Sequence, residues 1–172
     1  MKTVSLLSLL IVLTACTSFR DRDVAMTSIA NFEAEKYTGL WYEIARFPVS
    51  FQEGCTNTQA EYRLQDEGVL AVRNACFRDN ALSVIEGSAR VDGPGRLKVR
   101  LGAMPFAADY WVLWVDEDYQ TAVVGVPSGR AGWILNRSPE ISEDRLLAAR
   151  AVLEFNGYDL TALEMTPQEA TE

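Results

Sequence analysis

Three cysteines and the absence of histidine limit the chemistry that this chain could perform. The 172-residue sequence contains Cys16, Cys55 and Cys76 and no histidine. Histidine is the most frequent general base, and it shares the soft metal sites of proteins with cysteine. We therefore expect no catalytic residues, no cofactor and no metal site. An enzyme stays open as an alternative, because a buried Glu43 or a tyrosine could still act as an acid or a base.

Cys16 follows a segment typical of a lipoprotein signal peptide. Lys2 is followed by an apolar stretch that is shorter than the about 20 residues of a membrane-spanning helix. The run Leu13-Thr14-Ala15-Cys16 resembles the lipobox cut by lipoprotein signal peptidase. Residues 1–15 are predicted to be removed, which makes Cys16 the lipidated first residue, although a secretory signal with a free Cys16 stays open. Thr17 follows the cysteine at the position where an aspartate would suggest retention in the inner membrane. The resemblance therefore favours the outer membrane.

Cys55 and Cys76 are expected to form a disulfide. Alternating residues over 56–64 and 69–76 surround the turn Gln65-Asp66-Glu67-Gly68, and a hairpin folded there places positions 55 and 76 nearly opposite each other. A chain outside the cytoplasm meets conditions that permit disulfides. Two separate thiols are the alternative.

The length and charge of the chain bound its class and its partners. After removal of the signal, the remaining residues suit one domain with one core. The formal net charge is −8, which would repel the phosphates of nucleic acid. We therefore expect no nucleic-acid partner, and we attribute membrane association to the lipid on Cys16.

Short alternating segments from Gly39 onward predict an all-β barrel. In residues 96–101, period two places Leu97, Val99 and Leu101 on one face and three cations on the other. The other predicted strands cover residues 41–47, 56–64, 69–76, 82–91, 110–115, 121–126 and 133–137. Short connections rich in turn residues favour eight antiparallel strands in up-and-down order. Closed on itself, such a sheet holds side chains or one small ligand.

One helix is predicted after the barrel strands, and a tether before them. The helix begins after Ser142 and ends at Asn156-Gly157. Its apolar stripe should pack on the outside of the barrel and comprises Leu146, Ala149, Val152 and Leu153. Residues 159–165 could add a short last strand. Residues 16–31 lack periodicity and are interpreted as a lipidated terminus and tether, with the folded domain over residues 32–172.

Three motifs in order resemble those of the lipocalin family. Residues 37–48, YTGLWYEIARFP, resemble the opening motif in the version of bacterial lipocalins and apolipoprotein D. Asp116-Glu117-Asp118-Tyr119 and the segment 133–139 resemble the second and third motifs. The chain is therefore identified as a member of the bacterial lipocalins. This resemblance implies an eight-stranded antiparallel barrel with one C-terminal α-helix packed outside.

The resemblance assigns structural roles to three residues. In the family, the tryptophan of the first motif closes the barrel base and the arginine of the third packs on it. Trp41 and Arg137 would then form a cation–π pair worth about 0.5 to 2 kcal/mol. Gly39 is interpreted as a position where a side chain would not fit.

The resemblance also implies a lipid ligand. Similarity to the pocket of apolipoprotein D suggests that Tyr62, Asn74 and Trp111 point inward. Strand alternation extends the predicted ligand-binding set to Ala60, Leu64, Val72, Leu97, Val99, Leu101 and Leu113. Ala45 and Phe47 follow from Trp41 if no bulge intervenes. The expected ligand is a fatty acid or lysophospholipid with its head near the mouth, stored or carried in the envelope. The alternative is an assembly lipoprotein with a filled barrel.

Two departures from the family pattern concern the mouth of the barrel. The pair Cys55 and Cys76, which bacterial relatives lack, would lie at the mouth and stiffen it. Ala131-Gly132 stands where bacterial relatives usually carry larger residues, which would enlarge the cavity. The apolar segment Met104-Pro105-Phe106-Ala107 could form a rim to the cavity or an interface of a homodimer.

Overall fold

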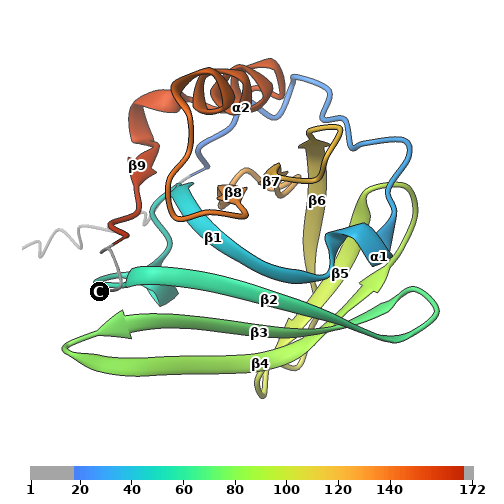
Figure 1. The fold of residues 1–172 in the computed structure, drawn as a ribbon. Helices are drawn as coiled ribbons and strands as arrows, with labels where there is room; N and C mark the ends of the chain where they lie inside the picture. The colour runs from blue at the N-terminus through green and yellow to red at the C-terminus, as the bar shows by residue number, and fades with distance from the viewer. Residues whose placement is uncertain (1–17, 169–172) are drawn as a thin grey trace, which may run out of the picture.

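The computed structural model describes residues 18–168 (Figure 1). The predicted signal peptide and the predicted lipidation site Cys16 lie outside the described residues. Nine strands form one sheet, of which eight close into a barrel.

The barrel is built as the alternating segments predict. Its strands are β1 (Gly39–Arg46), β2 (Thr56–Asp66), β3 (Val69–Arg78), β4 (Ala81–Val91), β5 (Arg96–Leu101), β6 (Ala108–Val115), β7 (Thr121–Gly125) and β8 (Gly132–Asn136). Each pairs antiparallel with the next, and β1 pairs with both β2 and β8, which closes the ring. The predicted eight-stranded up-and-down barrel is confirmed. Closure leaves none of these eight strands as a free edge.

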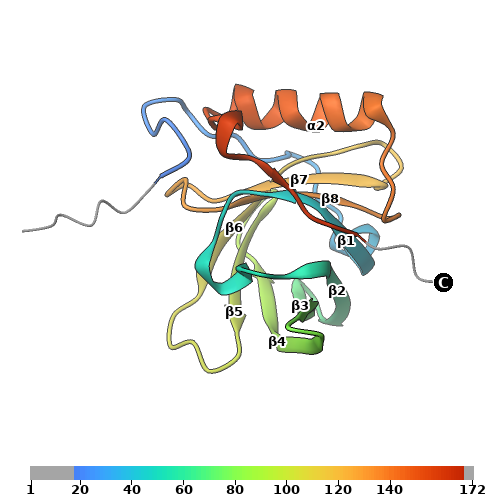
Figure 2. The same cartoon turned by 90° about the vertical axis from the view of Figure 1, so that its left-hand side faces the viewer.

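The elements after the barrel lie outside it. Helix α2 (Glu143–Phe155) begins after Ser142, as predicted, and covers one side of the barrel (Figure 2). Ala149 and Leu153 on its apolar face are fully buried in a core cluster shared with the strands. The segment that follows forms a single 3₁₀ turn, η2 (Leu160–Ala162), and a two-residue strand, β9 (Glu164–Met165), which pairs with β1.

The segment interpreted as a tether packs on the barrel over its described part, residues 18–31. The buried Arg20 donates from Nε to the carbonyl oxygen of Asn156 at 2.7 Å. The amide nitrogen of Ile29 donates to Val112 O at 2.9 Å, and the Phe19 ring stacks on Phe47 with centroids 5.3 Å apart. The sequence shows no periodicity here because single hydrogen bonds and contacts, rather than a repeating face, hold the segment.

The base of the barrel is closed around a fully buried Trp41. The guanidinium carbon of Arg137 lies 3.7 Å from the centroid of the Trp41 ring, and its nitrogens donate to carbonyl oxygens just before and within β1. Helix α1 (Ala34–Tyr37) completes the closure, since Tyr37 O accepts a hydrogen bond from the Trp41 indole at 2.8 Å. At Gly39, φ is +93° and a Cβ would lie 3.3 Å from Arg137, so a side chain would be strained there.

Candidate functional site

A cavity of about 740 Å³ occupies the barrel between this base and the loops at the opposite end. Side chains from the strands form most of its wall, and the loops 47–55, 102–107 and 126–131 supply residues at its mouth. Met104 and Ala107 line the cavity, so the apolar segment 104–107 contributes a rim. Ala131 also lines it, in keeping with the expectation that small residues there leave room.

Six of the predicted ligand-binding residues line this cavity. They are Ala60, Tyr62, Val72, Asn74, Val99 and Leu101. Two others share the inward-facing side of their strands but lie away from the cavity. Leu97 is buried in the core near the base, and Leu64 is 46% exposed toward the far end of β2. The alternation identified the inner face correctly in these strands, but depth along the barrel decides which inner residues reach the cavity.

On β6, the prediction for Trp111 and Leu113 is wrong. Tyr110 lines the cavity, whereas Trp111 lies on the outer surface with the Arg96 guanidinium carbon 4.2 Å from its ring centroid. Leu113 packs in the cluster beneath helix α2. The pattern Tyr110-Trp111-Val112-Leu113 is apolar on both faces because the outer face is covered by the helix, so hydrophobicity alone could not choose the inner one.

On β1, the prediction for Ala45 and Phe47 is also wrong. The pairing of β1 with β8 shifts register between Glu43 and Ala45. This bulge adds one residue and turns the later side chains to the opposite face. Glu43 lines the cavity, while Ala45 and Phe47 are buried outside it, where the Phe47 ring stacks on Tyr158 with centroids 4.9 Å apart.

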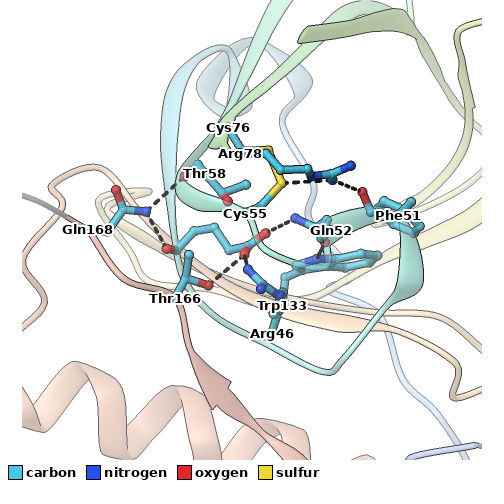
Figure 3. Close-up of a disulfide and its surroundings, with 11 residues drawn as sticks. Arg46, Phe51, Gln52, Cys55, Thr58, Cys76, Arg78, Trp133, Thr166 and Gln168 are labelled. Atoms are coloured by element: carbon cyan, nitrogen blue, oxygen red, sulfur yellow. Dashed lines mark hydrogen bonds and ion pairs between the residues drawn. A yellow bond between two sulfur atoms is a disulfide. The ribbon is translucent and has the colours of Figure 1, made fainter. Parts of the chain in front are cut away.

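Glu43 on β1 is held by a hydrogen-bonding network in the cavity wall, and Figure 3 shows the side chains of its partners Arg46, Gln52 and Thr166. Its side chain is 4% exposed and accepts hydrogen bonds from Arg46 at 3.0 Å and Thr166 at 2.7 Å on one oxygen. The second oxygen accepts from Gln52 Nε2 at 2.6 Å, and Gln52 Oε1 accepts from the Trp133 indole at 2.9 Å. Both oxygens accept hydrogen bonds, so this carboxylate forms a structural ion pair with Arg46.

The C-terminal segment joins β1 to β2 beside this network. Gln168 Nε2 donates to Glu43 O at 2.8 Å and to Thr58 O at 3.0 Å (Figure 3). The amide nitrogen of Thr166 donates to Ile44 O at 2.9 Å. These bonds bridge the gap where β1 and β2 no longer pair directly, and no motif in the sequence indicates them.

The disulfide between Cys55 and Cys76 is confirmed. The two Cα atoms lie 5.5 Å apart, and both cysteines line the mouth of the cavity. The bond ties the β1–β2 loop to the end of β3, as the hairpin predicts. Arg78 reinforces the same corner, because its Nη2 donates to Phe51 O at 2.6 Å and to Cys55 Sγ at 3.3 Å (Figure 3).

The two ends of the cavity differ in polarity. Arg78 and Arg130 line its mouth, and neither takes part in an ion pair within residues 18–168. At the base, the hydroxyl of Tyr110 lies 2.9 Å from those of both Tyr37 and Tyr62, which form a chain of three phenols. Burial raises the pKa values of Tyr37 and Tyr110 well above the usual value for tyrosine, and it raises the pKa of Tyr62 to about 12. All three phenols therefore stay neutral.

Comparison with known proteins decides the family. A family model described as a lipocalin-like domain matches residues 32–168. The chain belongs to the lipocalin family. The lipocalin is 38% identical over 159 residues to temperature-induced lipocalin-1 of Arabidopsis thaliana, which covers 85% of this chain and 84% of the relative. It is 36% identical over 140 residues to outer membrane lipoprotein Blc of Escherichia coli (strain K12), with 79% of each chain covered.

Further relatives agree with the motifs found in the sequence. Apolipoprotein D of Bos taurus is 32% identical over 148 residues, with coverage of 80% of this chain and 78% of the relative. Insecticyanin from the tobacco hornworm Manduca sexta superposes with a TM-score of 0.69 at 18% identity, over 85% of this chain and 86% of that structure. This structural likeness shows the fold alone.

Between residues 18 and 168, no helix is long and apolar enough to cross a membrane. Over the same range, histidine, cysteine, aspartate and glutamate residues form no group of three or more that could hold a metal ion.

Reduction of the disulfide should destabilise the lipocalin by about 2–4 kcal/mol, because the bond restricts the unfolded chain. The measurement is urea unfolding with and without reductant. The variant C55S/C76S should unfold at the same urea concentration in both conditions. Equal stability of the wild-type chain with and without reductant would contradict the expectation.

Alkaline pH should destabilise the lipocalin through its buried phenols. Tyr62 has an ordinary pKa of 10.0 in the unfolded chain and about 12 in the folded protein. The contribution of Tyr62 to the free energy of unfolding is therefore fully present below about pH 10. It is lost as the pH rises through about 12, and the loss amounts to about 3 kcal/mol. Urea unfolding between about pH 8 and about pH 12 measures the loss. The loss should be smaller in Tyr62→Phe, and an equal loss in that variant would contradict the assignment.

Proposed function

We propose that this lipocalin binds an elongated amphipathic lipid, such as a fatty acid or a lysophospholipid, and stores or transports it in the cell envelope. The observation that supports the proposal is the cavity of about 740 Å³, whose wall is largely aliphatic and aromatic. Ligand pockets of this volume and composition suit small hydrophobic molecules. A volume of this size also argues against the alternative of a barrel filled by its own side chains.

The cations at the mouth support an anionic head group at that end. Arg78 and Arg130 line the cavity beside the disulfide corner and the β7–β8 loop. A carboxylate or phosphate would form charge-assisted hydrogen bonds with a guanidinium there. The acyl chain would then extend inward along Ala60, Val99 and Leu101. An enzymatic role has less support, since the buried Glu43 carboxylate already accepts hydrogen bonds from Arg46, Gln52 and Thr166 that hold it in place.

The proposed place of the lipocalin is the outer membrane, anchored by lipid at Cys16 and facing the periplasm. The lipobox-like sequence supports the anchor, and several relatives are named outer membrane lipoproteins. We expect Cys16→Ser to abolish incorporation of labelled palmitate and to release the chain from the membrane fraction. A Cys16→Ser chain that still carries the label would refute lipidation at this residue.

The ligand is tested by native mass spectrometry of the chain purified from cells, followed by lipid extraction. We expect one acyl lipid per chain. Ala60→Trp fills the cavity from the inner face of β2, so it should lower the bound lipid at least about tenfold. Trp111→Ala is the matched control because Trp111 lies outside the barrel. An empty wild-type barrel that also refuses added fatty acids and lysophospholipids would refute the proposal.

A further inference from the structure

Among residues 18–168, the three phenols at the base of the cavity leave one hydroxyl hydrogen without an acceptor. The three phenols share two hydrogen bonds, one between Tyr37 and Tyr110 and one between Tyr62 and Tyr110, but they carry three hydroxyl hydrogens. A hydroxyl donates once and can accept twice. One of the three hydrogens must therefore find a partner outside the chain of phenols.

The spare hydrogen is best placed on Tyr110. Tyr62 donates its hydroxyl hydrogen to Tyr110, so only the direction of the bond between Tyr37 and Tyr110 is open. If Tyr37 also donates to Tyr110, the two lone pairs of Tyr110 are used and its own hydrogen is free. If Tyr110 donates to Tyr37 instead, the free hydrogen belongs to Tyr37, which is 0% exposed and does not line the cavity. Burying that donor unpaired would be costly, whereas Tyr110 faces the cavity.

A second polar group faces the same part of the cavity. Asn74 pairs with Ala60, two register positions from the Tyr62–Val72 pair and therefore on the same face, which makes it a diagonal neighbour of Tyr62. Asn74 lines the cavity, and its Oδ1 is buried without a hydrogen-bond partner among the described residues. A free donor and an amide with an unpaired oxygen thus lie near the base.

This polar base suits an uncharged oxygen rather than an anion. Among residues 18–168, the cations that line the cavity are Arg78 and Arg130, both at the mouth. Along β3, the span from Val72 near the base to Arg78 at the mouth is roughly 20 Å at about 3.3 Å per residue. An ionised group at the base would be desolvated without a counter-charge.

We propose that the lipocalin prefers long-chain acids that carry a second, uncharged oxygen far from the carboxylate, with Tyr110 donating a hydrogen bond to that oxygen. Hydroxylated acyl chains are the class of ligand that fits. The carboxylate binds at the cationic mouth and the distant hydroxyl reaches the phenols. This inference rests on the proposed lipid-binding function and adds a specificity-determining residue to it.

The test compares palmitic acid with ω-hydroxypalmitic acid, each displacing a fluorescent fatty acid from the purified chain. We expect the hydroxy acid to bind about threefold to tenfold more tightly, the gain of one neutral hydrogen bond. In Tyr110→Phe, the ratio of the two affinities should fall to about one. Tyr42→Phe removes a phenol that does not line the cavity, so it should keep the wild-type ratio.

The outcomes separate the inference from the function on which it rests. Equal affinities for the two acids in the wild-type chain would overturn the inference and leave lipid binding intact, and this comparison does not depend on the folding of any variant. A preference unchanged in a folded Tyr110→Phe would also overturn it. If neither acid displaces the probe from the wild-type chain, the proposed function fails as well.

Discussion

Replacing Trp41 with alanine should lower the free energy of unfolding by about 3–5 kcal/mol. The side chain is fully buried at the barrel base, against the Tyr37 ring at a centroid distance of 5.0 Å and beneath the Arg137 guanidinium. Its removal leaves a void there and takes the indole donor from Tyr37 O. Urea unfolding followed by circular dichroism measures the change.

Trp111→Ala is the matched control for this prediction. Trp111 also lies beneath an arginine, with the Arg96 guanidinium carbon 4.2 Å from its ring centroid, but it is only partly buried on the outer surface. We expect less than half the loss of stability seen for Trp41→Ala. Equal losses would show that closing the base contributes nothing beyond a cation–π contact.

Replacing Glu43 with alanine should also destabilise the protein by about 3–5 kcal/mol. The change leaves the Arg46 guanidinium, with its side chain 10% exposed, as a buried charge without its partner at 3.0 Å. Gln52 and Thr166 lose their acceptor at the same time. Because these residues connect β1, the mouth loop and the C-terminal segment, the loss should appear in equilibrium urea unfolding of the whole domain.

The control for Glu43 is a second ion pair with the same spacing along the chain. Glu33 and Lys36 are also three residues apart and lie 2.7 Å from each other, but their side chains are 54% and 55% exposed. Water screens this pair, so Glu33→Ala should cost far less stability than Glu43→Ala. Similar losses for Glu33→Ala and Glu43→Ala would contradict the view that burial makes the Glu43 pair important.

Local patterns were sufficient to predict the barrel. Period-two alternation, as in residues 96–101, and turn-forming connections indicated every barrel strand and their antiparallel order. The disulfide followed from a hairpin that brings Cys55 opposite Cys76. These features depend on neighbours close in sequence or on one hairpin, so the residues themselves carry enough information.

The candidate site was only partly predictable, because the direction of a side chain depends on contacts between distant segments. The register shift after Glu43 arises from pairing with β8 and moves Ala45 and Phe47 out of the cavity. Helix α2 covers the outside of β6, so both faces of that strand are apolar and the pattern does not tell which face Trp111 occupies. The polar contacts of residues 166–168 with β1 and β2 carry no periodic signal at all.

The sequence by itself determined the fold class, the order of the strands, the outer helix and the cysteine pair, since these follow from repeating patterns and short-range geometry. The tertiary structure alone decided which side chains face the cavity, how large the cavity is, and that three phenols from α1, β2 and β6 meet at its base. The physical reason is closure: only when the first and last strands of the barrel pair do inside and outside become defined, and a single bulge exchanges them.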